Sequence, residues 1–194
     1  MYDKYLINRQ PHLFRRKAEQ RGCLFLFGDA AESGDMAIIF LGPPGTGKTT
    51  TMHLLPEPWH ELSQNLIVVL PDMEKTPRVT CWTALLENAL QNPQDSWGIH
   101  HSPHLLAIFS LKRSSVESIK RLNNVESLGL LMEAIKRVWP DSTRGMPQIE
   151  ALEHRVRRFD SLAWLAKSIP CYELEMGTIG ACQKLIEKMI FQSS

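Results

Sequence analysis

Short, continuous apolar runs separate the polar stretches in the first two thirds of the chain. Such runs are typical of strands that are buried on both faces, and they lie at 23–27, 36–41, 66–70 and 105–111. Residues 78–83 predict a further short strand. Because only turn residues, 31–35, separate the first two runs, we expect them to pair as an antiparallel hairpin.

Apolar residues recur at helical spacing in the last third of the chain. One series runs from Val125 to Trp139, after a good N-cap at Asn123 or Asn124. A second series is predicted to face the core, and comprises Ile149, Leu152, Val156, Phe159, Leu162 and Ala166. A strand at 168–175 and a closing helix at 179–190 complete an order of elements that predicts an α/β chain.

The remaining segments are polar. Residues 1–22 are mixed in character, and we expect an N-terminal arm with a short helix near 13–20, followed by a single domain at 23–194. Residues 87–103 are rich in Asn, Gln, Pro, Ser and His, which predicts an exposed loop or lid. Its histidines, His100 and His101, with His104 just beyond, have no carboxylate or cysteine at ligand spacing, so a solvent loop is favoured over a metal site.

Composition narrows the class of protein. The 194 residues are 43% hydrophobic and 22% charged with a net charge of +1, as in a globular domain without overall attraction to nucleic acid or anionic membranes. The four cysteines are scattered, and neither a signal-peptide h-region nor an apolar run of about 18 residues occurs. We therefore expect a cytoplasmic protein without nucleic-acid or membrane partners.

The run at 36–41 leads directly into Gly-Pro-Pro-Gly-Thr-Gly-Lys-Thr, which matches the P-loop (Walker A) pattern at every fixed position. Glycines leave room for main-chain N–H groups to surround phosphates. We expect ATP and Mg²⁺ here, with Lys48 as the catalytic cation near the β- and γ-phosphates and the Thr49 hydroxyl on the metal. A helix at 50–55 should follow. The predicted nucleotide-binding residues are Gly42, Pro43, Pro44, Gly45, Thr46, Gly47, Lys48, Thr49 and Thr50.

The order of these elements resembles the HPr kinase-like family, whose fold is shared with phosphoenolpyruvate carboxykinases. The resemblance rests on the hairpin before the P-loop, Leu62-Ser63 before the strand at 66–70, the strand-plus-helix unit from 107 to 139, and Ile169-Pro170-Cys171-Tyr172-Glu173-Leu174. It implies a mixed sheet with helices packed around it. It also implies Mg²⁺-dependent transfer of the ATP γ-phosphate to a serine of a protein or peptide, and leaves homo-oligomerisation open.

The sequence departs from that family at one important place. Where relatives carry two acidic residues, this chain has Gln64 and Asn65, and neither amide is a useful general base at neutral pH. Asn65 could still ligate Mg²⁺ through its carbonyl oxygen. Asp72 is the nearest carboxylate, but it lies at the far end of the strand. Lys112 or Arg113, after the strand at 105–111, could reach a phosphate or lie in a surface turn.

Three functions remain open from the sequence. The first is a serine kinase of the HPr kinase-like type, slowed by the loss of the acidic pair. The second is a catalytically degenerate nucleotide-binding regulatory or partner protein. The third is an AAA-type ATPase, which shares this spelling of the P-loop, although that group predicts Asp-Glu directly after an apolar strand and this chain has Pro71-Asp72-Met73.

Overall fold

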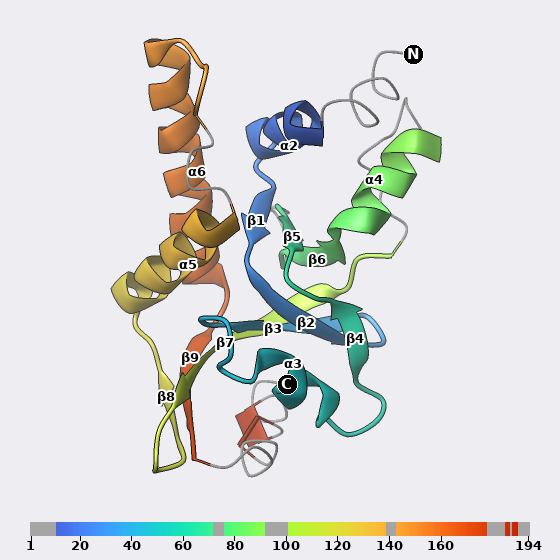
Figure 1. The fold of residues 1–194 in the computed structure, drawn as a ribbon, viewed down its shortest axis with the longest axis vertical. Coiled ribbons are helices and arrows are strands. Elements are labelled where there is room, and N and C mark those ends of the chain that lie inside the picture. The colour runs from blue at the N-terminus through green and yellow to red at the C-terminus, as the bar shows by residue number, and fades with distance from the viewer. Residues whose placement is uncertain are drawn as a thin grey trace.

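A mixed sheet forms the centre of the molecule, which we describe from a computed structural model for residues 11–71, 76–91, 101–138, 143–177, 185–186 and 188–189. Within these residues, nine strands follow the order β1-β5-β6-β7-β3-β2-β4, with β9 beside β7 and β8 beside β9 (Figure 1). The strands are β1 Leu24–Leu26, β2 Gly28–Ser33, β3 Met36–Leu41, β4 His60–Ser63, β5 Ile67–Leu70, β6 Arg78–Cys81, β7 His104–Arg113, β8 Ser118–Arg121 and β9 Cys171–Met176.

Helices cover both faces of this sheet. They are α2 Pro11–Gln20, α3 Lys48–His53, α4 Trp82–Gln91, α5 Asn124–Val138 and α6 Gln148–Ser168. Along β3, Ile39 belongs to the cluster that α5 and α6 cover, whereas Ile38 and Phe40 belong to the cluster that contains Met52 of α3. Figure 1 shows α5 and α6 on one side of the sheet and α3 on the other. Burial on both faces explains why β3 is a continuous apolar run.

The strand pairing is mostly antiparallel. Among the pairs between described strands, only β3 with β7 and β7 with β9 are parallel. The expectation of a mixed α/β chain with an antiparallel hairpin before the P-loop is confirmed at this level. No helix in the described part of the chain is long and apolar enough to cross a membrane.

The hairpin itself uses different residues from those predicted. The expected strand at 23–27 contains β1, which pairs with β5, while residues 28–33, expected to include the turn, form β2 and pair with β3. The turn is reduced to Gly34 and Asp35. Prediction failed because β2 contains Asp29 and Glu32 among small residues, a composition that disfavours a strand assignment although all six residues are buried.

Other boundaries also differ from the predictions. Residues 87–91, expected in a loop, continue helix α4, and 92–100 lie outside the described residues. The predicted strand at 78–83 ends at Cys81, and α3 begins at Lys48 rather than 50 and ends at His53. The expected arm contains α2, whose Phe14 and Ala18 are fully buried with residues of α4 and β5.

The N-cap of α5 was predicted correctly as one of two asparagines. The Asn123 side-chain oxygen accepts hydrogen bonds from the N–H groups of Val125 and Glu126, at 2.9 and 3.0 Å. Glu126 in turn accepts a bond from the Asn123 N–H at 2.9 Å. This reciprocal capping box fixes where α5 begins.

The predicted core-facing stripe of α6 is wrong at its first four positions. Leu162 and Ala166 are buried, as expected, but the four preceding members are exposed. The residues of α6 that face the core before Leu162 are instead Ala151 and His154. In this part of α6 the more apolar stripe, which begins at Ile149, is exposed, and the stripe that contains Ala151 and His154 is buried.

Gly28 is required by close packing in β2. A Cβ atom at this position would lie 2.5 Å from the main-chain oxygen of Phe40 and 2.7 Å from Leu41 Cδ2. We expect Gly28→Ala to lower the free energy of unfolding by about 1–3 kcal/mol, as overpacked substitutions do. Urea denaturation followed by circular dichroism measures the change.

Gly129→Ala is the matched control, because Gly129 lies in the middle of α5 and a Cβ there meets no atom within 4 Å. It should raise the stability by about 0.5–1 kcal/mol through the higher helix propensity of alanine. Equal effects of the two substitutions would contradict the packing argument for Gly28.

Candidate functional site

The P-loop follows β3 and runs through residues 42–47 into α3. Gly42 has a φ of 145°, and a Cβ atom at this position would lie 3.0 Å from the main-chain oxygen of Leu111 on β7. Gly47, with a φ of 93°, is the residue from which α3 begins. Both angles favour glycine, so these two fixed glycines of the motif are explained by the path of the loop from β3, past β7, into α3.

Lys48 is held against its own loop. Its Nζ donates hydrogen bonds to the main-chain oxygens of Gly42 and Pro43, each at 3.0 Å, and lies 5.2 Å from the centre of the Phe27 ring. The side chain is buried. Burial lowers the pKa of the Lys48 ammonium, the carboxylate of Asp29 opposes this, and the charge of Arg137 adds to it. A phosphate anion would offer this buried cation a stronger acceptor than two neutral carbonyls.

Asp29 of β2 completes the site, and the sequence reasoning missed it. Its Oδ2 accepts a hydrogen bond from the Thr49 hydroxyl at 2.5 Å, and its Oδ1 accepts one from the main-chain N–H of Asn65 at 3.0 Å. The residue is 1% exposed. One buried carboxylate therefore connects the P-loop threonine with the loop that joins β4 to β5.

The register of the hairpin brings Asp29 to the P-loop. Gly28 pairs with Leu41, the last residue of β3, and Asp29 pairs with Phe40. Asp29, which is thirteen positions before Gly42, thus lies beside the motif because β2 and β3 are antiparallel. The sequence offered one signal for this role, an acidic residue, Asp29, among apolar and small residues. A buried acidic residue is informative, but no strand or helix was predicted at this position.

Residues 64 and 65 make different contacts. Gln64 Nε2 donates to Glu61 Oε2 at 2.7 Å, and the same oxygen lies 3.0 Å from His53 Nε2. The hydrogen bond from His53 lowers the pKa of Glu61, as does that from Gln64. Asn65 is exposed, has a φ of 66°, and contributes its main-chain N–H to Asp29. The connection of this segment to the site is through Asp29.

The basic residues at the end of β7 separate in the structure. The Arg113 guanidinium donates to the main-chain oxygen of Gly45 in the P-loop at 2.7 Å. Lys112 instead pairs with Glu175 of β9 at 2.9 Å. Of the two predicted phosphate contacts, Arg113 is the one brought to the loop. Asp72 lies outside the described residues.

The described histidines of the segment for which a solvent loop was favoured over a metal site lie at separate places. His101, like His60, contacts the carboxylate of Glu32 near the β2–β3 turn, whereas His104 lies 3.0 Å from a nitrogen of Arg78. His100 is outside the described residues. Throughout the described ranges, no three His, Cys, Asp or Glu side chains group so as to hold a metal ion.

The donors at the P-loop nevertheless fit Mg²⁺ bound together with a nucleotide. Mg²⁺ in such sites takes one or two carboxylates, with phosphate oxygens and water filling the other positions. Asp29 supplies a buried carboxylate and Thr49 a hydroxyl, in direct contact with each other. Gly45 is open around its Cα, since a Cβ there would meet no atom within 4 Å. The main chain of the loop is therefore uncovered at the Cα of Gly45.

The chain matches a known protein family. The family model described as "SynChlorMet cassette protein ScmC" matches residues 6–192. No curated protein matches the chain.

Proposed function

The chain belongs to the ScmC family of SynChlorMet cassette proteins, and from its site we propose that it is a Mg²⁺- and ATP-dependent kinase of the HPr kinase-like type. The single observation that carries the proposal is the contact of Asp29 with the P-loop threonine, Thr49. Through this contact Asp29 adds a carboxylate to the site, whereas the sequence motif alone indicates only nucleotide binding.

Three side chains have separate roles in this proposal. Lys48 leaves the carbonyls of its loop and neutralises charge on the β- and γ-phosphates. Asp29 and Thr49 hold Mg²⁺, which when bound neutralises the charge that develops as the γ-phosphate is transferred. Asp29 also fixes the loop at Asn65 through the main-chain N–H. Because phosphoryl transfer depends mainly on positioning and charge neutralisation, such a site can work without an acidic pair at 64–65.

The proposed acceptor is a serine hydroxyl of a protein or peptide. The family description assigns its members to a cassette, so the other products of the same cassette are the first acceptors to test. Pro43, Pro44 and Gly45 of the P-loop are exposed. We therefore expect the acceptor to approach the site from the side of these residues.

The test is incubation with γ-labelled ATP, Mg²⁺ and each cassette product, for the wild-type chain and for Lys48→Ala. We expect label on a serine of one acceptor, and a loss of about 10²-fold or more in Lys48→Ala, because the lysine is the main protein cation on the phosphates. Lys167→Ala, an exposed lysine at the end of α6, is the control and should retain full transfer.

A second candidate is a nucleotide-binding regulatory protein without transfer chemistry. The observation that favours it is that residues 64 and 65 are amides and that the Gln64 side chain donates to Glu61, so this pair supplies no carboxylate to act as a general base. ATP binding that depends on Lys48, with neither transfer nor hydrolysis, would support this function and exclude the kinase. An AAA-type ATPase is less well supported, since β3 has an antiparallel neighbour, β2, in a mostly antiparallel sheet.

A further inference from the structure

Helix α6 carries a stripe of exposed apolar side chains. Ile149, Leu152, Val156 and Phe159 are 76%, 60%, 51% and 48% exposed, and the intervals between them are three, four and three residues. Figure 1 shows α6 at the edge of the molecule. Large apolar residues grouped in this way are typical of a surface that contacts another protein.

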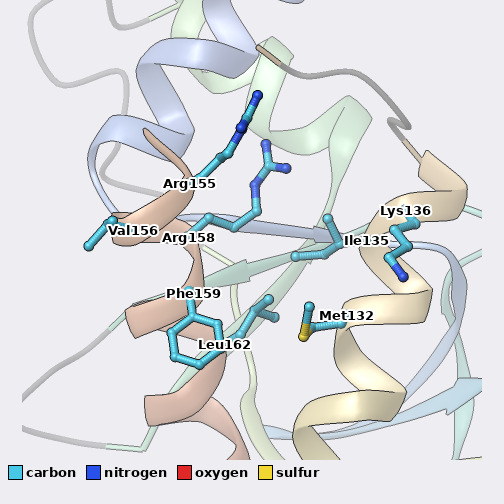
Figure 2. Close-up of a pocket in the computed structure, with 8 residues that line it drawn as sticks. All are labelled: Met132, Ile135, Lys136, Arg155, Val156, Arg158, Phe159 and Leu162. Carbon is cyan, nitrogen blue, oxygen red and sulfur yellow. The ribbon is translucent and has the colours of Figure 1, made fainter. Parts of the chain in front are cut away.

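A groove between α5 and α6 adjoins the stripe. It has a volume of about 440 Å³, with Met132 and Ile135 on the α5 side and Phe159 and Leu162 on the α6 side. Figure 2 shows Arg155 and Arg158 at one end of this groove and Lys136 on the rim of α5, while Val156 projects outward from α6. The edge of the stripe that adjoins the groove therefore carries the basic residues Arg155 and Arg158 next to apolar side chains.

The other edge of the stripe carries two acidic residues, one of which, Glu153, pairs with Arg157 of the same helix at 3.8 Å. On a helix with 3.6 residues per turn, Glu153 and Asp160 lie on the side of the stripe opposite Arg155. All three side chains are exposed. A stripe with one basic and one acidic edge is complementary to itself when two copies of the helix lie side by side in the same direction.

The spacing of the stripe selects this arrangement. With Ile149 and Val156 at heptad positions a, Leu152 and Phe159 are at positions d, and β-branched residues at a with Leu at d favour parallel two-stranded packing. Arg155 is then at position g and Asp160, five residues later, at position e. In a parallel pair, position g of one helix faces position e of the next heptad of the other. An antiparallel pair would instead bring like charges together.

We propose that two copies of the chain form a two-fold symmetric dimer through parallel α6 helices. The exposed stripes pack against each other, and Arg155 pairs with Asp160 of the partner subunit on both sides of the two-fold axis. A symmetric contact needs a surface that complements itself, and the stripe with its two edges meets this requirement. This inference is independent of the proposed kinase activity.

Sedimentation velocity tests the dimer directly. At about 100 µM, a hundredfold above a micromolar Kd, the wild-type chain should sediment as a dimer. Leu152→Glu should be a monomer, because it places like charges at a buried d position; Leu152 is 60% exposed in the single chain, so folding should not depend on it. Val125→Glu, at an 80% exposed position of α5, is the control and should remain dimeric.

Charge exchange tests the direction of the helices. Asp160→Arg should weaken the dimer by about tenfold, since two symmetric pairs become like charges, and adding Arg155→Asp should restore it. Leu152→Cys should form a disulfide between the two copies, because identical d positions meet only in a parallel pair. A monomeric wild-type chain, or a dimer that Leu152→Glu leaves intact, would overturn the proposal; failure of the charge exchange to restore the dimer would overturn the parallel direction.

Discussion

Asp29→Asn is expected to remove most of the effect of Mg²⁺ on ATP binding while leaving the fold intact. The substitution keeps the shape of the side chain, but it removes the negative charge and replaces one acceptor oxygen with an amide donor. The amide can keep both contacts, because its oxygen can accept from the Asn65 N–H while its NH2 group donates to the Thr49 hydroxyl oxygen. The fold should therefore be retained while the carboxylate charge is lost. Removal of a residue that only orients a metal ligand already costs about 10–100-fold in metal affinity or activity, so the loss of a ligating carboxylate should cost at least as much.

Titration of ATP in the presence of Mg²⁺ or of EDTA measures this effect without an acceptor protein. The wild-type chain should bind ATP more tightly with Mg²⁺, and the variant should lose about 10–100-fold of that gain. Asp35→Asn is the matched control: it lies in the turn of the same hairpin, its carboxylate is 70% exposed, and it pairs with Arg78 at 3.8 Å. If Asp29→Asn lowers stability but leaves the Mg²⁺ effect unchanged, Asp29 only supports the loop at Asn65.

The P-loop could be predicted from the sequence, but its partner could not. The residues from Gly42 to Thr49 are contiguous, and their path follows from local backbone geometry. Asp29 reaches Thr49 only through the register of β2 on β3, which depends on burial that the sequence hides. Because β2 consists mainly of small and acidic residues, it has no apolar pattern that would predict a strand. The apolar segment that contains β1 was therefore predicted as the partner of β3 in place of β2.

The stripes of α6 show a second limit of periodicity. The spacing of Ile149, Leu152, Val156 and Phe159 correctly indicates one apolar face of a helix, but spacing does not say what covers that face. The buried face in this part of α6 includes His154, which is 3% exposed. A polar residue is acceptable there because it bonds to Glu19 of α2, a contact between residues 135 positions apart.

Glu19→Gln is expected to be among the most destabilising conservative substitutions in the chain. Glu19 Oε1 accepts a bond from Arg158 at 3.2 Å, and Oε2 lies 3.0 Å from His154 Nε2. Arg15 lies 3.9 Å away on the same helix, and burial lowers the pKa of this arginine to about 10. One carboxylate therefore compensates two largely buried guanidinium groups, and joins α2 to α6.

The expected loss of unfolding free energy is about 3 kcal/mol, the lower end of the range for removing one partner of a buried ion pair, because glutamine keeps one acceptor oxygen. Urea denaturation at neutral pH measures it, with the m value as a check that the unfolding remains two-state. Glu133→Gln is the control: Glu133 pairs with Lys136 at 2.8 Å, but both side chains are more than 60% exposed. Its midpoint should not change.

The dependence on pH separates the charge of Glu19 from its packing. Burial alone would raise the pKa of Glu19, but the hydrogen bond to His154 and the charges of Arg158 and Arg15 hold it below its ordinary value of 4.5. A carboxyl group with a lowered pKa in the folded chain stabilises the fold above the unfolded value, and this contribution is lost as the pH falls through the folded pKa. The difference in stability between wild type and Glu19→Gln should therefore be full at neutral pH and shrink below pH 4.5. A difference that stays constant down to acid pH would mean that the substitution acts through shape alone, and that the two arginines do not require the charge.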